Sequence, residues 1–186
     1  MARLRGLSVV LVLAAFLLFP VTISYTSGDV PEGCEQVFAA TSRGGASRPS
    51  GWPGCTLVTV TPSGVVVERV IDGDTITIAG GDEVRYIGLD SPETYPQAEP
   101  FGAEATRFNR DLVEGRRVRL EVDVSDRDRF GRLLRYVYLG DILVNAELVR
   151  EGYAEAVAYP PDTRYQRCLS ALQDEAQAEA RGMWRK

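Results

Sequence analysis

The sequence predicts an α+β fold, mainly β, in which three α-helices pack around a five-stranded β-barrel of the OB type. Three observations predict this fold. β-Rich runs begin at Val65, turn signals separate these runs, and the elements follow the order three strands, helix, two strands, helix, helix. A curled five-stranded sheet with helices around it fits this order. The 186 residues leave room for one such domain and an appendage.

The first three strands form the clearest part of the pattern. "VVVERVI" (65–71), "TITIA" (75–79) and "EVRYIGL" (83–89) are β-rich runs with period-two alternation. The turn signals "DGD" and "GGD" separate them. These runs therefore predict a three-stranded antiparallel meander.

One helix and two further strands follow the meander. "FGAEATRFNRDLVEG" (101–115) has helical periodicity and ends at Gly115, a typical C-cap residue. Its expected apolar stripe consists of Phe101, Ala105, Phe108 and Leu112. "RVRLEVD" (117–123) and "RLLRYVYL" (132–139) then predict the fourth and fifth strands.

Two helices are expected in the C-terminal part. "NAELVREG" (145–152) reads as a short helix with Asn145 as its N-cap and Gly152 at its end. After "YPPD" (159–162), residues 162–182 predict a last amphipathic helix.

The chain divides into three segments by composition. Residues 1–23 carry two arginines and then an apolar run that ends at Pro20, as an N-terminal signal peptide or membrane anchor does. Residues 21–23 could extend the run into an uncleaved anchor. Residues 24–62 are a flexible Gly/Ser/Pro-rich linker, and residues 63–186 are the folded domain. We expect the protein to be secreted or anchored on the extracytoplasmic side of the membrane.

The three cysteines suggest one disulfide. Cys34 and Cys55 lie in the linker, whereas Cys168 lies on the last expected helix. There it shares a stripe with Leu169 and Leu172, which predicts a buried thiol. The simplest pairing joins Cys34 to Cys55 in an oxidising compartment. The alternative is three free thiols.

The composition excludes several kinds of active site. The chain has no histidine, which excludes histidine-based triads, histidine general bases and zinc sites with histidine ligands. Any hydrolase here must work with carboxylates, arginines and hydroxyls, with or without a hard metal ion. The net charge of −5 argues only weakly against nucleic acid, because a basic cleft can lie on an acidic molecule.

Two aspartates flank a glycine in the first turn. Asp72 and Gly73 are typical of a hairpin turn between strands. Asp74 opens the second strand, where aspartate is disfavoured and needs a partner. That partner is either a neighbouring backbone N–H group or a ligand.

The segment "VRYIGLDSPET" supplies further carboxylates and an arginine. Arg85 lies within a strand, Asp90 lies at its end, and Pro92 forces an extended turn that carries Glu93. Strand pairing can bring Asp74 and Asp90 together at one rim of the sheet. Two carboxylates, a backbone carbonyl and waters suit Ca2+. The alternative role for Arg85 is a salt bridge with one of these acids.

A tight Phe-Gly turn in "DRDRFGRLLRYVYL" carries three arginines, Arg127, Arg129 and Arg132. Such a cluster is usually a solvated charged turn. The functional alternative is that Arg132 reaches the same cleft and binds a phosphate.

Several separated motifs resemble one known family. In order, "IDGDT", "VRYIGLDSPET", "FGAEA", "DRFGR", "VNAELVREGYA" and "YPPD" resemble the signature segments of the staphylococcal nuclease (thermonuclease) family. The resemblance covers about residues 65–184. It implies an OB-type barrel with three helices that hydrolyses phosphodiester bonds of DNA and RNA with Ca2+ and little sequence specificity.

The resemblance also implies a metal site. Asp74 and Asp90 would be metal ligands, together with the backbone carbonyl of Ser91. Asp72 would lie close to the metal without being a principal ligand. Ser91 stands where the family usually has threonine, which matters little if only its carbonyl binds.

The resemblance further implies roles in substrate binding and catalysis. Arg85 and Arg132 would bind the phosphate and stabilise the charged transition state, and Glu93 would orient or deprotonate the attacking water. Tyr159 would add a weak substrate contact, because a proline pair follows it. Phe130 stands where the family often has tyrosine, so a hydroxyl contact to substrate would be lost.

The expected partners follow from these roles. DNA and RNA would be substrates, membrane contact would occur only through an uncleaved N-terminal segment, and the protein would be a monomer. One alternative is a catalytically inactive OB-fold module that binds nucleic acid or protein. Another is an acidic, exported calcium-binding surface protein.

Overall fold

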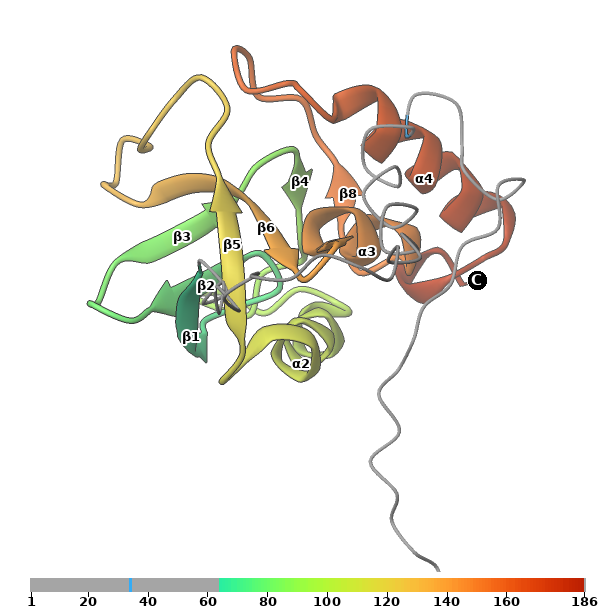
Figure 1. Ribbon diagram of the computed structural model, residues 1–186. Helices are drawn as coiled ribbons and strands as arrows, with labels where there is room; N and C mark the ends of the chain where they lie inside the picture. Colours follow the sequence, from blue (N-terminus) through green and yellow to red (C-terminus); the bar gives the residue numbers. More distant parts are fainter. Residues whose placement is uncertain (1–33, 35–63, 186) are drawn as a thin grey trace, which may run out of the picture.

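The computed structural model describes Cys34 and residues 64–185 (Figure 1). The expected boundaries of the segments 1–23 and 24–62 lie outside the described residues, as does Cys55. Among the residues described, no helix is long and apolar enough to cross a membrane.

Five strands close into the expected OB-type barrel. They are β1 (Val65–Val70), β2 (Thr75–Ile78), β3 (Glu83–Tyr86), β5 (Arg117–Glu121) and β6 (Leu133–Leu139). Antiparallel pairing gives the order β3-β2-β1-β5-β6, and parallel pairing of β3 with β6 closes the sheet. The prediction of a mainly β fold with a five-stranded barrel is therefore confirmed.

In the described part of the chain, three further strands are short. β7 (Ile142–Leu143) pairs with the end of β6, and β4 (Leu89–Asp90) pairs with β8 (Glu155–Ala156) in a separate two-stranded sheet. The single strand expected over residues 83–89 is wrong, because Gly88 adopts a positive φ of 83° that interrupts it. This break places Asp90 on β4 and not on β3.

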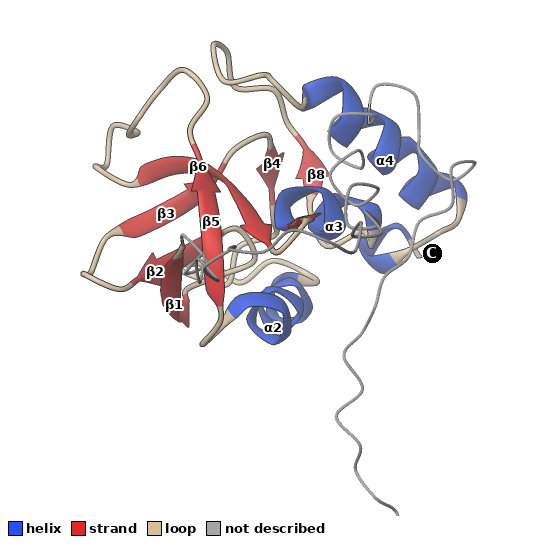
Figure 2. Ribbon diagram, viewed as in Figure 1, coloured by secondary structure: helices blue, strands red, loops and turns tan. Residues whose placement is uncertain are grey.

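In the part of the chain that the structure describes, three α-helices pack around the barrel, as expected. They are α2 (Gly102–Val113), α3 (Val144–Arg150) and α4 (Gln166–Ala178), and the short 3-10 helix η2 (Gly182–Trp184) follows. Figure 2 shows α2 against one end of the barrel and α3 between the barrel and α4. α4 is therefore shorter than the helix expected over residues 162–182.

Two details of the helices differ from expectation. Asn145 is not an N-cap but a fully buried residue inside α3, whose amide bonds the backbone of Val137 and Ile87. The expected stripe of α2 is also wrong in part. The helix buries mainly small and polar side chains, namely those of Ala105, Thr106, Asn109 and Val113, while Phe108 and Leu112 are only partly buried. The large rings of Phe108 and Tyr153 instead stack on each other at 4.2 Å.

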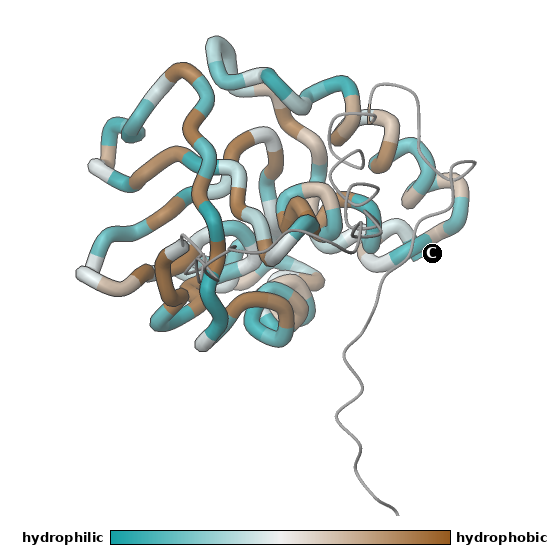
Figure 3. Tube along the Cα trace, viewed as in Figure 1, coloured by the Kyte–Doolittle hydropathy of each residue, from teal (hydrophilic) through white to brown (hydrophobic). Residues whose placement is uncertain are grey.

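The hydrophobic core fills the barrel and continues beneath the helices. Hydrophobic stretches follow β1 and β6, while the connecting loops are largely hydrophilic (Figure 3). The largest fully buried side chains include Tyr86, Ile76, Leu148, Leu169 and Leu172. The last two belong to α4, so this helix contributes directly to the core.

The disulfide differs from the expected one. Cys34 is bonded to Cys168 of α4, with 4.6 Å between their Cα atoms, and both residues are fully buried. The pairing of Cys34 with Cys55 is therefore wrong, and Cys168 is buried but is not a free thiol. The pairing depends on which face of α4 meets Cys34, and 134 residues separate the two cysteines. Chain spacing alone carries no information on such a contact.

Candidate active site

Two aspartates from different segments meet at one arginine. Nη1 of Arg85 lies 2.8 Å from Oδ2 of Asp74, and Nη2 of Arg85 lies 2.6 Å from Oδ1 of Asp90. Pairing of β2 with β3 produces the first contact, because Thr75 faces Arg85 in register. The structure thus brings Asp74 and Asp90 together, with the guanidinium of Arg85 between them.

The Asp74 carboxylate is held on both oxygens. Oδ1 accepts a hydrogen bond from the hydroxyl of Thr75 at 3.0 Å, and Oδ2 accepts one from the N–H of Ser91 at 2.8 Å. Asp74 and Ser91 are both buried, with 4% and 5% of their surface exposed. These bonds fix the carboxylate relative to the loop that follows β4.

The turn before β2 has a well-defined backbone. The N–H groups of Ile71 and Asp72 both donate to the carbonyl of Thr75, and the N–H of Asp74 donates to Oδ1 of Asp72 at 3.0 Å. A Cβ atom on Gly73 would lie 2.6 Å from the Cβ of Ser91. Glycine is therefore required where the turn meets the loop after β4.

The carboxylates leave a surplus of negative charge at this rim. Burial and the charge of Asp74 raise the pKa of Asp72 to about 7. Burial also raises the pKa of Asp90, although the charge of Arg85 opposes it. Burial and the charges of Asp74 and Asp90 raise the pKa of Glu93. Each of these carboxylates would gain from a nearby cation.

Glu93 lies on the loop that joins β4 to α2. Its N–H donates to Oε2 of Glu99 at 3.0 Å, and the N–H of Glu99 donates back to the carbonyl of Glu93 at 2.8 Å. A Cβ atom on Gly102 would lie 2.6 Å from the Glu93 carbonyl oxygen. The absence of a side chain at the start of α2 therefore lets this loop pack against the helix, and Glu93 is only partly removed from solvent.

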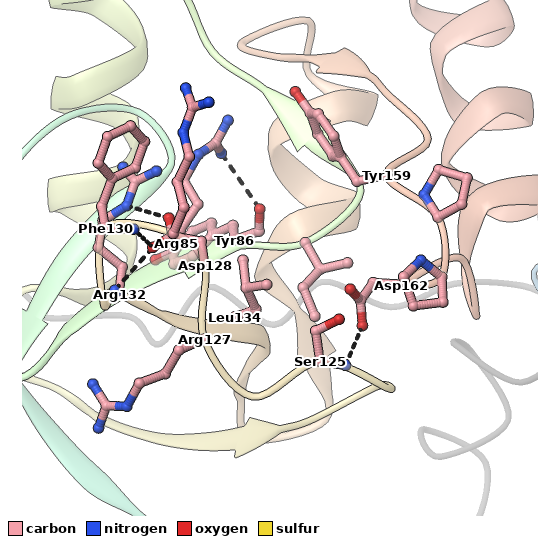
Figure 4. Close-up of a pocket in the computed structure, with 14 residues that line it drawn as sticks. Arg85, Tyr86, Ser125, Arg127, Asp128, Phe130, Arg132, Leu134, Tyr159 and Asp162 are labelled. Carbon is pink, nitrogen blue, oxygen red and sulfur yellow. Dashed lines mark hydrogen bonds and ion pairs between the residues drawn. The ribbon is translucent and has the colours of Figure 1, made fainter.

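Arg132 reaches the same cleft from the loop between β5 and β6. A pocket of about 490 Å³ is lined by Arg85, Arg132, Phe130 and Tyr159, among others. Figure 4 shows Phe130 and Arg132 on one side of this pocket and Tyr159 on the other. Phe130 is 69% exposed and Tyr159 is 45% exposed.

Asp128 holds Arg132 in place. Its Oδ2 lies 2.7 Å from Nε of Arg132, and its Oδ1 accepts the N–H groups of Arg132 at 3.0 Å and of Phe130 at 2.9 Å. Burial alone would raise the pKa of Asp128, but these bonds outweigh it and lower the pKa. Arg129 and Arg132 also lie over the Phe130 ring, at 4.7 and 5.5 Å from its centroid.

Sequence reasoning missed three residues that support the site. Asp128 was detectable, because it stands four residues before Arg132 in a tight turn. Asp162 accepts the N–H groups of Val124 and Ser125 and so anchors the loop that carries Arg132. Asn109 donates to the carbonyl of Asp72 from α2. The last two contacts span 37 or more residues and leave no local signal.

The donor set at the rim fits a hard cation. Asp74 and Asp90 present carboxylate oxygens to one positive charge. Ser91, which follows Asp90 in the chain, has a backbone carbonyl as a further oxygen donor. An all-oxygen set suits Ca2+. In the described part of the chain, no group of three or more Cys, Asp or Glu side chains is arranged to hold a metal.

Comparison with known proteins identifies the family. A protein-family model described as "Staphylococcal nuclease homologue" matches residues 83–186, more than half of the chain. The thermonuclease of Staphylococcus intermedius is 43% identical over 127 residues, which cover 65% of this chain and 76% of that protein. The thermonuclease of Staphylococcus hyicus is 40% identical over 124 residues, with coverages of 63% and 73%. Endonuclease YncB of Bacillus subtilis is 38% identical over 130 residues, with coverages of 66% and 62%. The chain therefore belongs to the staphylococcal nuclease family.

Proposed function

We propose that this protein is an exported, Ca2+-dependent nuclease that cleaves both DNA and RNA with little sequence specificity. The coarser statement, that it is a nuclease hydrolysing phosphodiester bonds, follows from its family and from relatives named thermonuclease and endonuclease. One observation supports the finer proposal most directly. Arg85 contacts the carboxylate pair Asp74 and Asp90 and also lines the pocket that contains Arg132.

The two arginines would bind the scissile phosphate. A guanidinium group offers planar, paired donors that match phosphate oxygens. Arg85 and Arg132 enter the pocket from different elements, so together they can contact two sides of one phosphate. Their charges would stabilise the negative charge that develops on the phosphoryl oxygens in the transition state.

The metal would be held by the carboxylates of Asp74 and Asp90 and by the carbonyl of Ser91. When bound, Ca2+ would supply Lewis-acid stabilisation of the phosphoryl oxygens. The hydrogen bonds from Thr75 and Ser91 keep the Asp74 carboxylate in one orientation.

Glu93 would act as the general base. A water oxygen would form the new bond to phosphorus, and a proton of that water would move to the Glu93 carboxylate. The bond from phosphorus to the leaving sugar oxygen would break, and that oxygen would take up a proton from solvent. Burial and the neighbouring acids raise the pKa of Glu93, which makes it a stronger base than an ordinary carboxylate. We propose, from the family resemblance, that the products carry 3′-phosphate ends.

The location is a second part of the proposal. The apolar N-terminal segment would direct export, and the Cys34–Cys168 disulfide is of the kind that persists in oxidising compartments. The protein would act as a monomer and touch the membrane only if residues 1–23 are not removed. Fractionation of the producing cells and N-terminal sequencing of the exported protein would test this.

Activity assays with metal and with variants test the catalytic proposal. The full chain, purified in its oxidised form, is incubated with single-stranded DNA and with RNA, in Ca2+ or in excess chelator. Glu93→Ser and Arg85→Ala are compared with the controls Glu83→Gln and Arg107→Ala, which change exposed residues outside the site. We expect hydrolysis that requires Ca2+, collapses in the two site variants and persists in the controls. A folded wild-type protein that cleaves neither polymer would contradict the proposal and favour a binding module.

A further inference from the structure

We propose that Asn109 is a positioning residue, which holds the turn carrying Asp74 through a hydrogen bond to the carbonyl of Asp72. The inference rests on the proposed function, because it assigns a purpose to the geometry of that site. Asn109 belongs to α2 and is fully buried. Its side chain touches neither substrate nor metal in this assignment, so it acts only through the turn.

The two bonds of Asn109 have only one chemically consistent direction. Its Nδ2 lies 3.2 Å from the carbonyl oxygen of Asp72, and its Oδ1 lies 3.0 Å from the hydroxyl of Tyr86. A carbonyl oxygen can only accept, so the amide nitrogen must face Asp72. The amide oxygen then faces Tyr86, whose hydroxyl donates to it.

The turn is consequently held on both sides of Gly73. The carbonyl of Asp74, on one side, accepts the N–H of Tyr86 at 2.9 Å. The carbonyl of Asp72, on the other side, accepts the amide of Asn109. β3 thus holds one peptide of the turn directly, while Asn109 links the other to α2 and to the Tyr86 side chain.

α2 supports both acidic segments of the site along one face. A Cβ atom on Gly73 would lie 3.0 Å from the Cβ of Ala105, and one on Gly102 would lie 2.6 Å from the Glu93 carbonyl oxygen. Small residues at 102 and 105 therefore let the turn and the Glu93 loop approach the helix. Asn109, one turn further along, contributes the hydrogen bond that sets the turn's orientation.

A polar pair at this place is poorly explained by stability alone. The Tyr86 hydroxyl and the Asn109 amide are both removed from water, which costs desolvation that their hydrogen bonds roughly offset. An apolar pair of similar shape would serve the core about equally well. The bond to Asp72 is what an apolar residue at 109 could not provide.

Two variants separate positioning from stability. Tyr86→Phe removes the donor to Asn109 Oδ1 but leaves the bond from Nδ2 to Asp72 intact. The double variant Tyr86→Phe/Asn109→Leu removes the whole polar pair and the bond to Asp72, while leucine keeps a side chain close in size to asparagine. Each protein is compared with wild type by thermal melting, calorimetric Ca2+ binding, kcat and amide hydrogen exchange of residues 71–75.

We expect the two variants to rank in opposite order by melting temperature and by function. Tyr86→Phe should melt below the double variant, because it leaves the side-chain oxygen of the fully buried Asn109 without a donor, whereas the Asp72 carbonyl that the double variant releases belongs to a residue that is only partly buried. It should nevertheless keep the wild-type Ca2+ affinity, kcat and exchange. The double variant should bind Ca2+ about 10-fold or more weakly, as is typical when a supporting partner of a metal ligand is lost. Its kcat should fall by a similar factor, and its turn should exchange faster.

The inference is overturned if the double variant retains wild-type Ca2+ affinity and wild-type amide hydrogen exchange. It is also overturned if the variant with the lower melting temperature is the one with the lower kcat and the weaker Ca2+ binding. A wild-type protein without hydrolysis would defeat the proposed function and with it the catalytic purpose of Asn109. Hydrogen exchange would still decide, in that case, whether Asn109 holds the turn.

Discussion

Oδ2 of Asp74 lies 2.8 Å from Nη1 of Arg85, so a residue proposed to bind metal is paired with one proposed to bind phosphate. Asp90 contacts the other terminal nitrogen of the same guanidinium at 2.6 Å. The arginine therefore neutralises the same two carboxylates that a cation would need. Metal binding and the Arg85–carboxylate contacts should therefore compete.

Arg85→Ala should lower kcat by about 10²- to 10³-fold, the usual cost of losing a group that stabilises transition-state charge. It should not weaken Ca2+ binding, and by removing a competing cation it should strengthen it. Steady-state kinetics and calorimetry on the same protein test both effects. Arg85→Lys, which keeps the charge but loses the planar fork, is the conservative comparison. Weaker Ca2+ binding in Arg85→Ala would refute the competition between the arginine and the metal.

Asp128→Ala should impair phosphate binding without touching substrate. Arg132 would lose the carboxylate that fixes its Nε, and the turn would lose two backbone hydrogen bonds. Because misplacement of a binding group by about 1 Å costs about 10²-fold, kcat/KM should fall by up to that factor. Asp141→Ala, in an exposed turn, is the matched control. Equal kinetics in the two variants would count against a positioning role for Asp128.

Asp162 should make stability dependent on acid pH. Burial raises its pKa, but the hydrogen bonds from Ser125 and Val124 outweigh burial and lower the pKa below its ordinary value of 3.8. The unfolded chain therefore binds the proton more readily. The stabilisation is fully present above the unfolded pKa and is lost as pH falls through the lower, folded pKa.

Asp162→Asn should accordingly reduce the free energy of unfolding at pH 7 by about 2 kcal/mol, the order expected for hydrogen bonds to a charged group. The difference from wild type should shrink below about pH 4, where the unfolded aspartate is protonated. Urea unfolding at pH 7 and pH 3 measures it. A difference that is the same at both pH values would rule out the ionised carboxylate as its source.

Removal of the disulfide should destabilise the domain. Cys34→Ala or Cys168→Ala should lower the free energy of unfolding by about 2–4 kcal/mol, the typical contribution of a disulfide. Cys55→Ala is the control and should change little. Peptide mapping under non-reducing conditions identifies the linked pair directly, and a Cys34–Cys55 peptide would contradict the structure.

Much of the fold was predictable because its signals are local. The runs that form β1, β2, β5 and β6 read as strands and end at glycine or aspartate turns, so neighbouring residues alone define them. The break in β3 was missed, because a glycine within an apolar run does not reveal that its φ will be positive. The buried face of α2 was missed in part, because the tight approach of Gly73 and of the Glu93 loop favours small side chains over the larger apolar ones.

The sequence by itself determined the order of the barrel strands and the presence of acidic and basic residues at their ends. Hydrophobic periodicity and turn chemistry are properties of adjacent residues, which is why these features could be derived. Only the tertiary structure decided which residues meet. It joined Cys34 to Cys168, placed Arg85 between Asp74 and Asp90, and set Asn109 against Asp72. The bonds that span long stretches of chain depend on how helices pack on the barrel, and no short stretch of sequence encodes that packing.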